Sequence, residues 1–203
     1  MNDDSTQPQF DRETALVVVD VQNDFADPRG GLHVQDGEQV VEVINALIAR
    51  ARAAGAPVVF TQDWHPPETP HFDTHGGVWP VHCVRDTWGA ELHPGLDADD
   101  AEPVVRKGTD GSDGYSGFSV RDPVSGEQSA TELGRILDER GVRHLVVTGL
   151  AGDVCVKETA LDGRRQGHDV VVPLAATRFV ELAAGDGQRA VDEMAAAGVT
   201  VIA

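Results

Sequence analysis

Residues 145–155 read Leu-Val-Val-Thr-Gly-Leu-Ala-Gly-Asp-Val-Cys, an apolar run followed by a short turn that ends in Cys155. Two other short apolar runs are also followed directly by a polar side chain that can take part in catalysis. Asp20 follows residues 15–19, and Lys107 follows a weaker run. Runs of this length and composition predict strands that are buried on both faces. The pattern therefore predicts an acid, an amine and a thiol at strand ends.

The rest of the chain alternates between such strands and segments of helical periodicity. Apolar spacing predicts helices over 38–54, 129–140, 154–166 and 186–197, with a capping box opening the second at Ser129 and Asp153 capping the third. The other predicted strands cover 57–61, 144–148, 170–173 and 200–202. This order predicts an α/β fold, with a six-stranded parallel sheet between two layers of helices.

Length and composition narrow the class of protein. The 203 residues fit one domain over 1–203, of which the polar segment 1–13 is expected to be frayed. A formal net charge of -18 argues against nucleic acid as a partner. No apolar run approaches the roughly 20 residues that cross a bilayer. With no signal-like segment, and with only Cys83 and Cys155, the chain is expected to be cytoplasmic.

Cys155 has the features of a nucleophile. It lies near a predicted helix start, where N–H groups and the helix dipole favour a thiolate and, with the N–H of Ala151, could bind an oxyanion. Ligands of open parallel sheets bind beyond the carboxyl ends of the strands, so Lys107 is expected to lower the thiol pKa and Asp20 to carry the proton. The alternatives are a small buried apolar residue for Cys155 and ordinary surface charges for the other two.

A second group of residues has the chemistry of a metal site. Asp63 and His65 project to the same side of an extended segment, and His71, His75 and His82 follow within twenty residues. A carboxylate with imidazoles suits Zn²⁺, Mn²⁺ or Fe²⁺. The alternative is a set of loop histidines with ordinary hydrogen bonds.

Two long loops, 66–101 and 108–126, are expected to form the walls of a pocket, since long loops in compact α/β domains are usually functional. Phe25, Trp79 and Tyr115 fall on predicted pocket loops in a chain that is only 5% aromatic. They could hold a flat ring between them, or they could anchor the loops.

Taken together, these segments resemble the nicotinamidase/pyrazinamidase branch of the isochorismatase-like hydrolases, in order along residues 15–180. The resemblance is carried by five segments: Val19 to Phe25, Asp63 to Pro66, Val78 to Cys83, Lys107-Gly108 with Tyr115 to Phe118, and Gly149 to Val156.

The resemblance implies a three-layer fold with strand order 3-2-1-4-5-6 and a non-proline cis peptide at Leu150–Ala151. It implies that Asp20, Lys107 and Cys155 form a triad and that the N–H groups of Ala151 and Cys155 form the oxyanion hole. One divalent metal, zinc ahead of manganese or iron, would bind Asp63, His65, His82 and His71 rather than His75. The residues expected to hold the ring are Phe25, Trp79 and Tyr115.

The implied activity is hydrolysis of nicotinamide to nicotinate and ammonia through a cysteine thioester, with pyrazinamide also accepted. The expected partner is this small-molecule substrate, and whether the chain forms a homo-oligomer is left open. Two alternatives remain: an amidase of the same superfamily acting on a carbamoyl or ureido substrate, and a non-catalytic binding protein on this scaffold. The family often has Thr or Ser where this chain has Gly152, which predicts a looser turn. The loop before Tyr115 is longer than usual, which leaves the ring contact of Tyr115 open.

Overall fold

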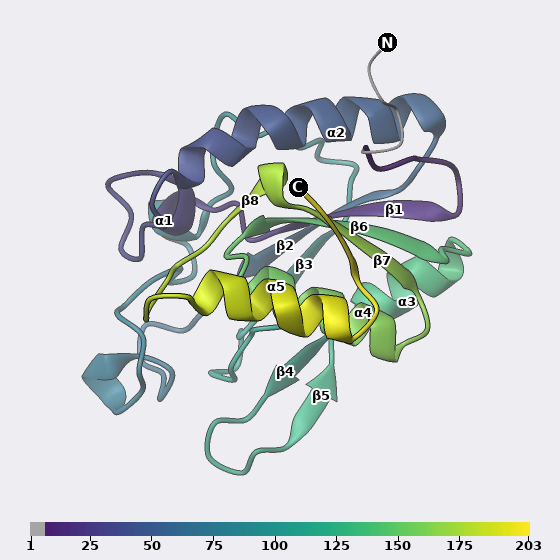
Figure 1. Ribbon diagram of the computed structural model, residues 1–203. Helices are drawn as coiled ribbons and strands as arrows, with labels where there is room; N and C mark the ends of the chain where they lie inside the picture. Colours follow the sequence, from purple (N-terminus) through teal and green to yellow (C-terminus); the bar gives the residue numbers. More distant parts are fainter. Residues whose placement is uncertain (1–6) are drawn as a thin grey trace.

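A parallel sheet runs through the centre of the molecule, with helices on both faces (Figure 1). The computed structural model describes residues 7–203. Its main strands lie in the order β3-β2-β1-β6-β7-β9, and every neighbouring pair is parallel. They are β1 (Thr14–Val19), β2 (Val58–Asp63), β3 (Val104–Lys107), β6 (His144–Leu150), β7 (Asp169–Pro173) and β9 (Thr200–Ile202). In chain order this is 3-2-1-4-5-6, so the predicted topology is confirmed.

The central strand β1 shows why the sheet has a helical layer on each side. Its six residues are all buried. Leu16 and Val18 belong to the core cluster under α2 (Val40–Ala54), whereas Ala15, Val17 and Val19 belong to the cluster on the opposite face. Alternate side chains of a strand point to opposite faces, so a continuous apolar run requires cover on both.

The helices divide unequally between the two faces (Figure 1). The face opposite α2 is covered by α3 (Leu133–Glu139), α4 (Cys155–Arg165) and α5 (Asp186–Ala196). A short turn of 3-10 helix, η2 (Gly37–Gln39), leads into α2, which ends where Gly55 adopts a φ of 70°. Within residues 7–203, none of the helices combines the length and apolarity that crossing a membrane requires.

The sequence did not predict several short elements. A hairpin of β4 (Ser119–Arg121) and β5 (Gln128–Ala130) projects from the body, and β8 (Thr177–Arg178) pairs with β6 beyond the end of β7. The long loop between β2 and β3 contains η3 (Asp73–His75) and η4 (Trp88–Ala90), and η5 (Leu174–Ala176) precedes β8. The four-residue α1 (Asn23–Ala26) follows β1 closely.

Two predicted helix caps are wrong. Ser129 pairs with Val120 in the hairpin, and α3 begins later, where the Thr131 hydroxyl oxygen accepts a hydrogen bond from the N–H of Leu133. The carboxylate of Asp153 does not cap α4. It accepts hydrogen bonds from two N–H groups of the segment after β8, those of residues 180 and 181. In both cases a more distant partner competes for the polar group.

The N-terminal segment differs in part from the frayed end that the sequence predicts. Residues 1–6 lie outside the described part of the chain. In the rest of the segment, the Arg50 guanidinium donates hydrogen bonds to the carbonyl of Pro8 and the side chain of Gln7. It also lies 5.7 Å from the centre of the Phe10 ring. These contacts attach residues 7–10 to α2.

Candidate active site

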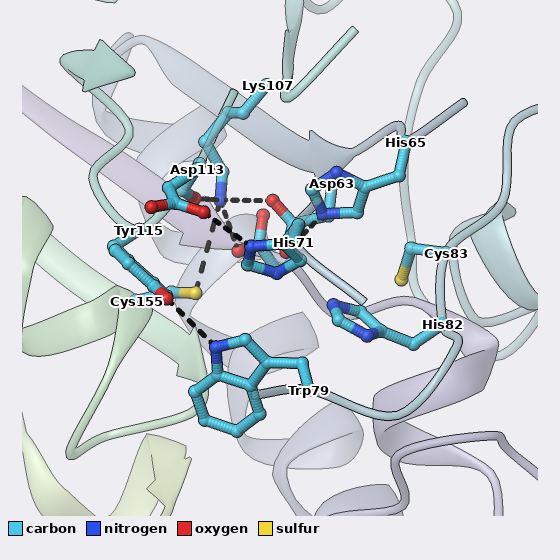
Figure 2. A network of polar contacts seen from close by, with 12 residues as sticks. Asp63, His65, His71, Trp79, His82, Cys83, Lys107, Asp113, Tyr115 and Cys155 are labelled. Atoms are coloured by element: carbon cyan, nitrogen blue, oxygen red, sulfur yellow. Dashed lines mark hydrogen bonds and ion pairs between the residues drawn. The ribbon is translucent and has the colours of Figure 1, made fainter. Parts of the chain in front are cut away.

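Lys107 lies at the centre of a buried polar cluster at the carboxyl edge of the sheet (Figure 2). Its ammonium donates to Asp20 Oδ2 at 2.8 Å, to Asp63 Oδ1 at 2.7 Å and to the carbonyl of Gly114. It also lies 4.0 Å from the Cys155 sulfur. The side chains come from the ends of β1, β2 and β3 and from the start of α4, and Gly114 lies on the loop after β3, so the structure brings the predicted triad together. The side chain of Lys107 is fully buried, which requires paired carboxylates around it.

Asp20 follows β1 directly and has a φ of 50°. Its Oδ1 accepts a hydrogen bond from the Thr61 hydroxyl at 2.6 Å, while Oδ2 faces Lys107. Burial raises the pKa of Asp20, and the nearby ammonium offsets only part of this effect. A carboxylate with a raised pKa is a better proton acceptor than an ordinary aspartate. No local sequence pattern predicted this contact with Thr61.

Cys155 is the first residue of α4 and lines the cavity beside this cluster. Its sulfur lies within 4.8 Å of carboxylate oxygens of both Asp20 and Asp63. Burial raises the pKa of the Cys155 thiol well above its usual range, although Lys107 opposes the shift. Desolvation outweighs the effect of the Lys107 ammonium on the thiol, against the expectation of a lowered thiol pKa. The thiol needs a base when it attacks.

Three imidazoles form a second buried cluster, adjacent to the first (Figure 2). Nitrogen atoms of His65, His71 and His82 lie within 4.8 Å of one another. Asp63 connects the two clusters, since its Oδ1 meets Lys107 while its Oδ2 lies 3.8 Å from His65 Nε2. Burial acts to raise the pKa of Asp63, but the ammonium prevails and holds it well below its usual range. The carboxylate therefore stays ionised.

The imidazole cluster has the features of a site for a divalent metal. Both ring nitrogens of His65 are buried and have no hydrogen-bond partner within residues 7–203. Such unsatisfied groups are costly unless something else binds them. Burial lowers the pKa of His82 to about 4, so its imidazole is neutral at pH 7 and has a free lone pair. His75 lies apart, exposed in η3, and contacts Thr74.

The cavity beside Cys155 has an aromatic wall. Phe25, Trp79 and Tyr115 line it, as the sequence predicts, and Trp79 Nε1 donates a hydrogen bond to the Tyr115 hydroxyl at 2.9 Å. Three apolar wall residues were not predicted from the sequence: Leu32, Val154 and Val180. Leu32 and Val180 lie on loops with no periodicity, and Val154 directly precedes α4. Imidazoles of the second cluster border the same cavity, so a flat ring held there would meet both the thiol and the histidines.

The turn from β6 into α4 contains the expected cis peptide at Leu150–Ala151. Within residues 7–203, the N–H groups of Ala151 and Cys155 donate to no backbone carbonyl, and both residues line the cavity. Gly152 does not loosen this turn. Its N–H donates to the carbonyl of Arg178 at 2.7 Å, and a Cβ placed on it would lie 2.6 Å from a ring carbon of Phe179. Phe179 fills the space that a side chain would take.

Polar residues between the clusters hold the loops in place, and the sequence analysis did not assign them. The Gln22 amide donates to the carbonyls of Asp63 and Ala90, and its oxygen accepts from the N–H of Asp63. The Asp24 carboxylate accepts from the N–H groups of Gly31 and Cys83. Gln22 and Asp24 both lie in the motif that follows β1, so that motif could have identified them as functional residues. The carboxylate of Asp113, 2.7 Å from His71 Nδ1, has no comparable signal.

Comparisons with known proteins agree with this geometry. The model of the isochorismatase domain matches residues 14–203. The nicotinamidase of Escherichia coli (strain K12) is 36% identical to this chain over 92% of the chain and 93% of its own length.

Two solved structures are similar in fold and in sequence. The pyrazinamidase of Pyrococcus horikoshii in complex with zinc superimposes with a TM-score of 0.83 at 34% identity, covering 94% of this chain and 98% of its own. PnC1 from L. infantum in complex with nicotinate gives a TM-score of 0.86 at 36% identity, covering 96% and 94%. The chain therefore belongs to the isochorismatase family, and within it is similar over nearly its full length to nicotinamidases and pyrazinamidases.

Proposed function

We propose that this protein is a nicotinamidase, which hydrolyses nicotinamide to nicotinate and ammonia. One observation carries the proposal: the Cys155 thiol lies between a buried carboxylate–ammonium pair and an aromatic cavity that is bordered by the imidazoles of His71 and His82. The first arrangement suits attack on an amide carbonyl, and the second suits a flat nitrogen-containing ring. The nicotinate complex of a similar protein, PnC1 from L. infantum, supports the same substrate class here.

The first half of the reaction forms a thioester. Asp20 accepts the proton of the Cys155 thiol as the sulfur attacks the carboxamide carbon, and Lys107 stabilises the ionised forms of both. The N–H groups of Ala151 and Cys155 donate to the oxyanion of the tetrahedral intermediate. The intermediate collapses when Asp20 returns the proton to the departing nitrogen, which breaks the C–N bond and releases ammonia.

The second half restores the enzyme. Asp20, ionised again, accepts a proton from a water molecule that attacks the thioester carbon, and the same N–H groups hold the new oxyanion. The C–S bond then breaks, Asp20 returns its proton to the sulfur, and the product acid loses its own proton to solvent and leaves as nicotinate. Lys107 stays charged throughout, since the carboxylates around it keep its pKa well above its usual range.

His65, His71, His82 and the Oδ2 of Asp63 would hold the divalent metal. When bound, the metal supplies a Lewis acid for the ring nitrogen of the substrate and so contributes orientation and polarisation. Zinc suits a set of imidazoles with one carboxylate, and manganese or iron are the alternatives. The same pocket would accept pyrazinamide, whose ring also presents a nitrogen.

An aromatic wall and the imidazole cluster favour a ring amide over a flexible carbamoyl or ureido substrate. A relative named ureidoacrylate amidohydrolase, 32% identical over 74% of this chain, makes that second class worth testing. An ammonia-release assay over nicotinamide, pyrazinamide and a ureido acid separates the two. We expect the highest kcat/KM for nicotinamide, and a preference for the ureido acid would contradict the proposal.

Cys155→Ala tests the nucleophile. We expect it to lower ammonia release on the order of 10⁶-fold, the scale seen when a catalytic nucleophile is removed, while the metal content and the circular dichroism spectrum stay unchanged. In the unmodified protein, rapid acid quenching during turnover should trap a nicotinoyl adduct on Cys155 that mass spectrometry detects. Cys83, fully buried, is the internal control and should carry none. Retained activity in Cys155→Ala would overturn the mechanism.

A further inference from the structure

The three histidines of the imidazole cluster are held in three different ways. His82 Nδ1 donates to the backbone carbonyl of Pro80 at 2.7 Å. His71 Nδ1 lies 2.7 Å from Asp113 Oδ1, and since an ionised carboxylate can only accept, the imidazole donates. His65 has no hydrogen-bond partner within the described chain, but its ring packs against Gly108, where a Cβ would lie 2.5 Å from the ring. Of the three rings, His71 is the one that is hydrogen-bonded to a carboxylate, whereas Asp63 Oδ2 lies 3.8 Å from His65 Nε2.

The contact between His71 and Asp113 fixes the chemical form of the ring. A proton on Nδ1 leaves Nε2 as the atom with the free lone pair. The rings of His71 and His65 stack with their centres 4.5 Å apart, so His71 lies against the other imidazoles. Its orientation therefore determines whether its lone pair can meet an ion that His65 and His82 also bind.

Asp113 itself is held firmly. Its backbone N–H and carbonyl both pair with Arg121, at 2.7 and 2.9 Å, which ties it to the last residue of β4. Its carboxylate is largely buried and, within residues 7–203, hydrogen-bonds to no group other than His71. A buried carboxylate with a single partner, on a backbone fixed at both sides, is well placed to orient that partner.

We propose that Asp113 is a positioning residue that raises the affinity of this protein for its divalent metal by holding the His71 ring in the metal-binding tautomer and orientation. The inference rests on the proposed metal site and adds a residue to it. Carboxylates that support a metal-bound histidine in this way typically contribute about 10–100-fold in metal affinity. Asp113 lies 42 residues from His71 in the sequence and close to the aromatic wall, so it also joins the metal loop to the loop that carries Tyr115.

The test measures Zn²⁺ affinity directly, by competition with a chromophoric chelator at pH 7, on the full chain. We expect Asp113→Ala to weaken the Zn²⁺ Kd by about 10–100-fold relative to the unmodified protein. Asp113→Asn should fall between them, because its amide oxygen can still accept from Nδ1 but carries no charge. Thermal unfolding of the metal-free forms checks that each variant is folded before Kd values are compared.

Asp110→Asn is the matched control, since Asp110 lies on the same loop as Asp113. Its carboxylate hydrogen-bonds to Ser112 and not to a histidine. The Kd of this variant should stay within about twofold of the unmodified protein. If Asp113→Ala and Asp113→Asn also stay within twofold, the role of Asp113 is overturned, while the proposed amidase function is untouched. If the unmodified chain does not bind Zn²⁺ at all, the metal site fails and this inference fails with it.

Discussion

The triad and the imidazole cluster meet at Asp63, yet different kinds of structure hold them. Asp20 and Lys107 lie at strand ends, and Cys155 begins a helix one short turn after β6. Their neighbours are fixed by the backbone pairing of the sheet. His71 and His82 instead lie in the long irregular loop between β2 and β3. There, side chains from distant segments hold the His71 ring and the backbone of Cys83. The sheet thus sets the geometry of the triad and of Asp63, and loop contacts set the geometry of the metal ligands His71 and His82.

The largest expected effect breaks the strand-end cluster. Lys107→Met leaves the carboxylates of Asp20 and Asp63 buried without their shared ammonium. Removing one partner of a buried ion pair typically destabilises by about 3–5 kcal/mol, and we expect a loss of this size together with loss of activity. Urea unfolding measures it.

Lys157→Met is the control, since this second lysine forms ion pairs at the surface with Glu158 and Glu193. It should cost no more than about 1 kcal/mol. Equal losses in the two variants would show that the buried cluster contributes nothing special to stability.

The second prediction concerns the loop. Zn²⁺ at a free concentration of about 100 times its Kd should raise the free energy of unfolding by about 2.7 kcal/mol, because it binds only the folded chain. His82→Ala removes a ligand and should lose most of this gain at the same Zn²⁺ concentration. Parallel unfolding curves with chelator and with Zn²⁺ measure the gain for each protein. An undiminished gain in the variant would place the ion elsewhere.

The same division explains what the sequence could predict. The strands and the place of Asp20, Lys107 and Cys155 follow from local signals, since each apolar run marks a strand and the reactive residue lies just past it. The order of the strands is implied by the family resemblance instead. The capping-box spacing predicted a helix start at Ser129, and this prediction is wrong. The pairing of β4 with β5, a longer-range contact, determines the structure there. Asp113 could not be found, since its significance depends on a histidine 42 residues away.

The third prediction tests whether the β6–α4 turn is as tightly packed as the strand ends. Gly152→Ser introduces a Cβ about where the ring of Phe179 now lies, and the backbone of Gly152 is not in the left-handed region, so the clash alone decides the outcome. Overpacking of this kind costs about 1–3 kcal/mol. Adding Phe179→Ala should make the serine nearly harmless, and a double-mutant cycle of unfolding free energies measures the coupling. Additive effects would mean that Phe179 does not fill this space.

The smallest expected effect concerns proton transfer. Asp20 must be ionised in the free enzyme to accept the thiol proton, so kcat/KM should fall as the pH drops through its pKa, which burial raises above the usual value. The Thr61 hydroxyl stabilises the ionised form, hence Thr61→Val should raise this pKa further and move the acid limb to higher pH. A hydrogen bond to a charged group is worth about 1.5 kcal/mol, which corresponds to a shift of about one pH unit.

Thr148→Val is the matched control for that shift, because the Thr148 hydroxyl is equally buried but donates to the carbonyl of Val17 in the sheet. It should leave the acid limb in place even if it lowers stability. A shift to lower pH in Thr61→Val, or the same shift in both variants, would mean that the limb does not report the ionisation of Asp20. Thr61 belongs to β2. A shift confined to the Thr61 variant would therefore show that the sheet also controls the pKa of Asp20, the group that accepts the Cys155 proton.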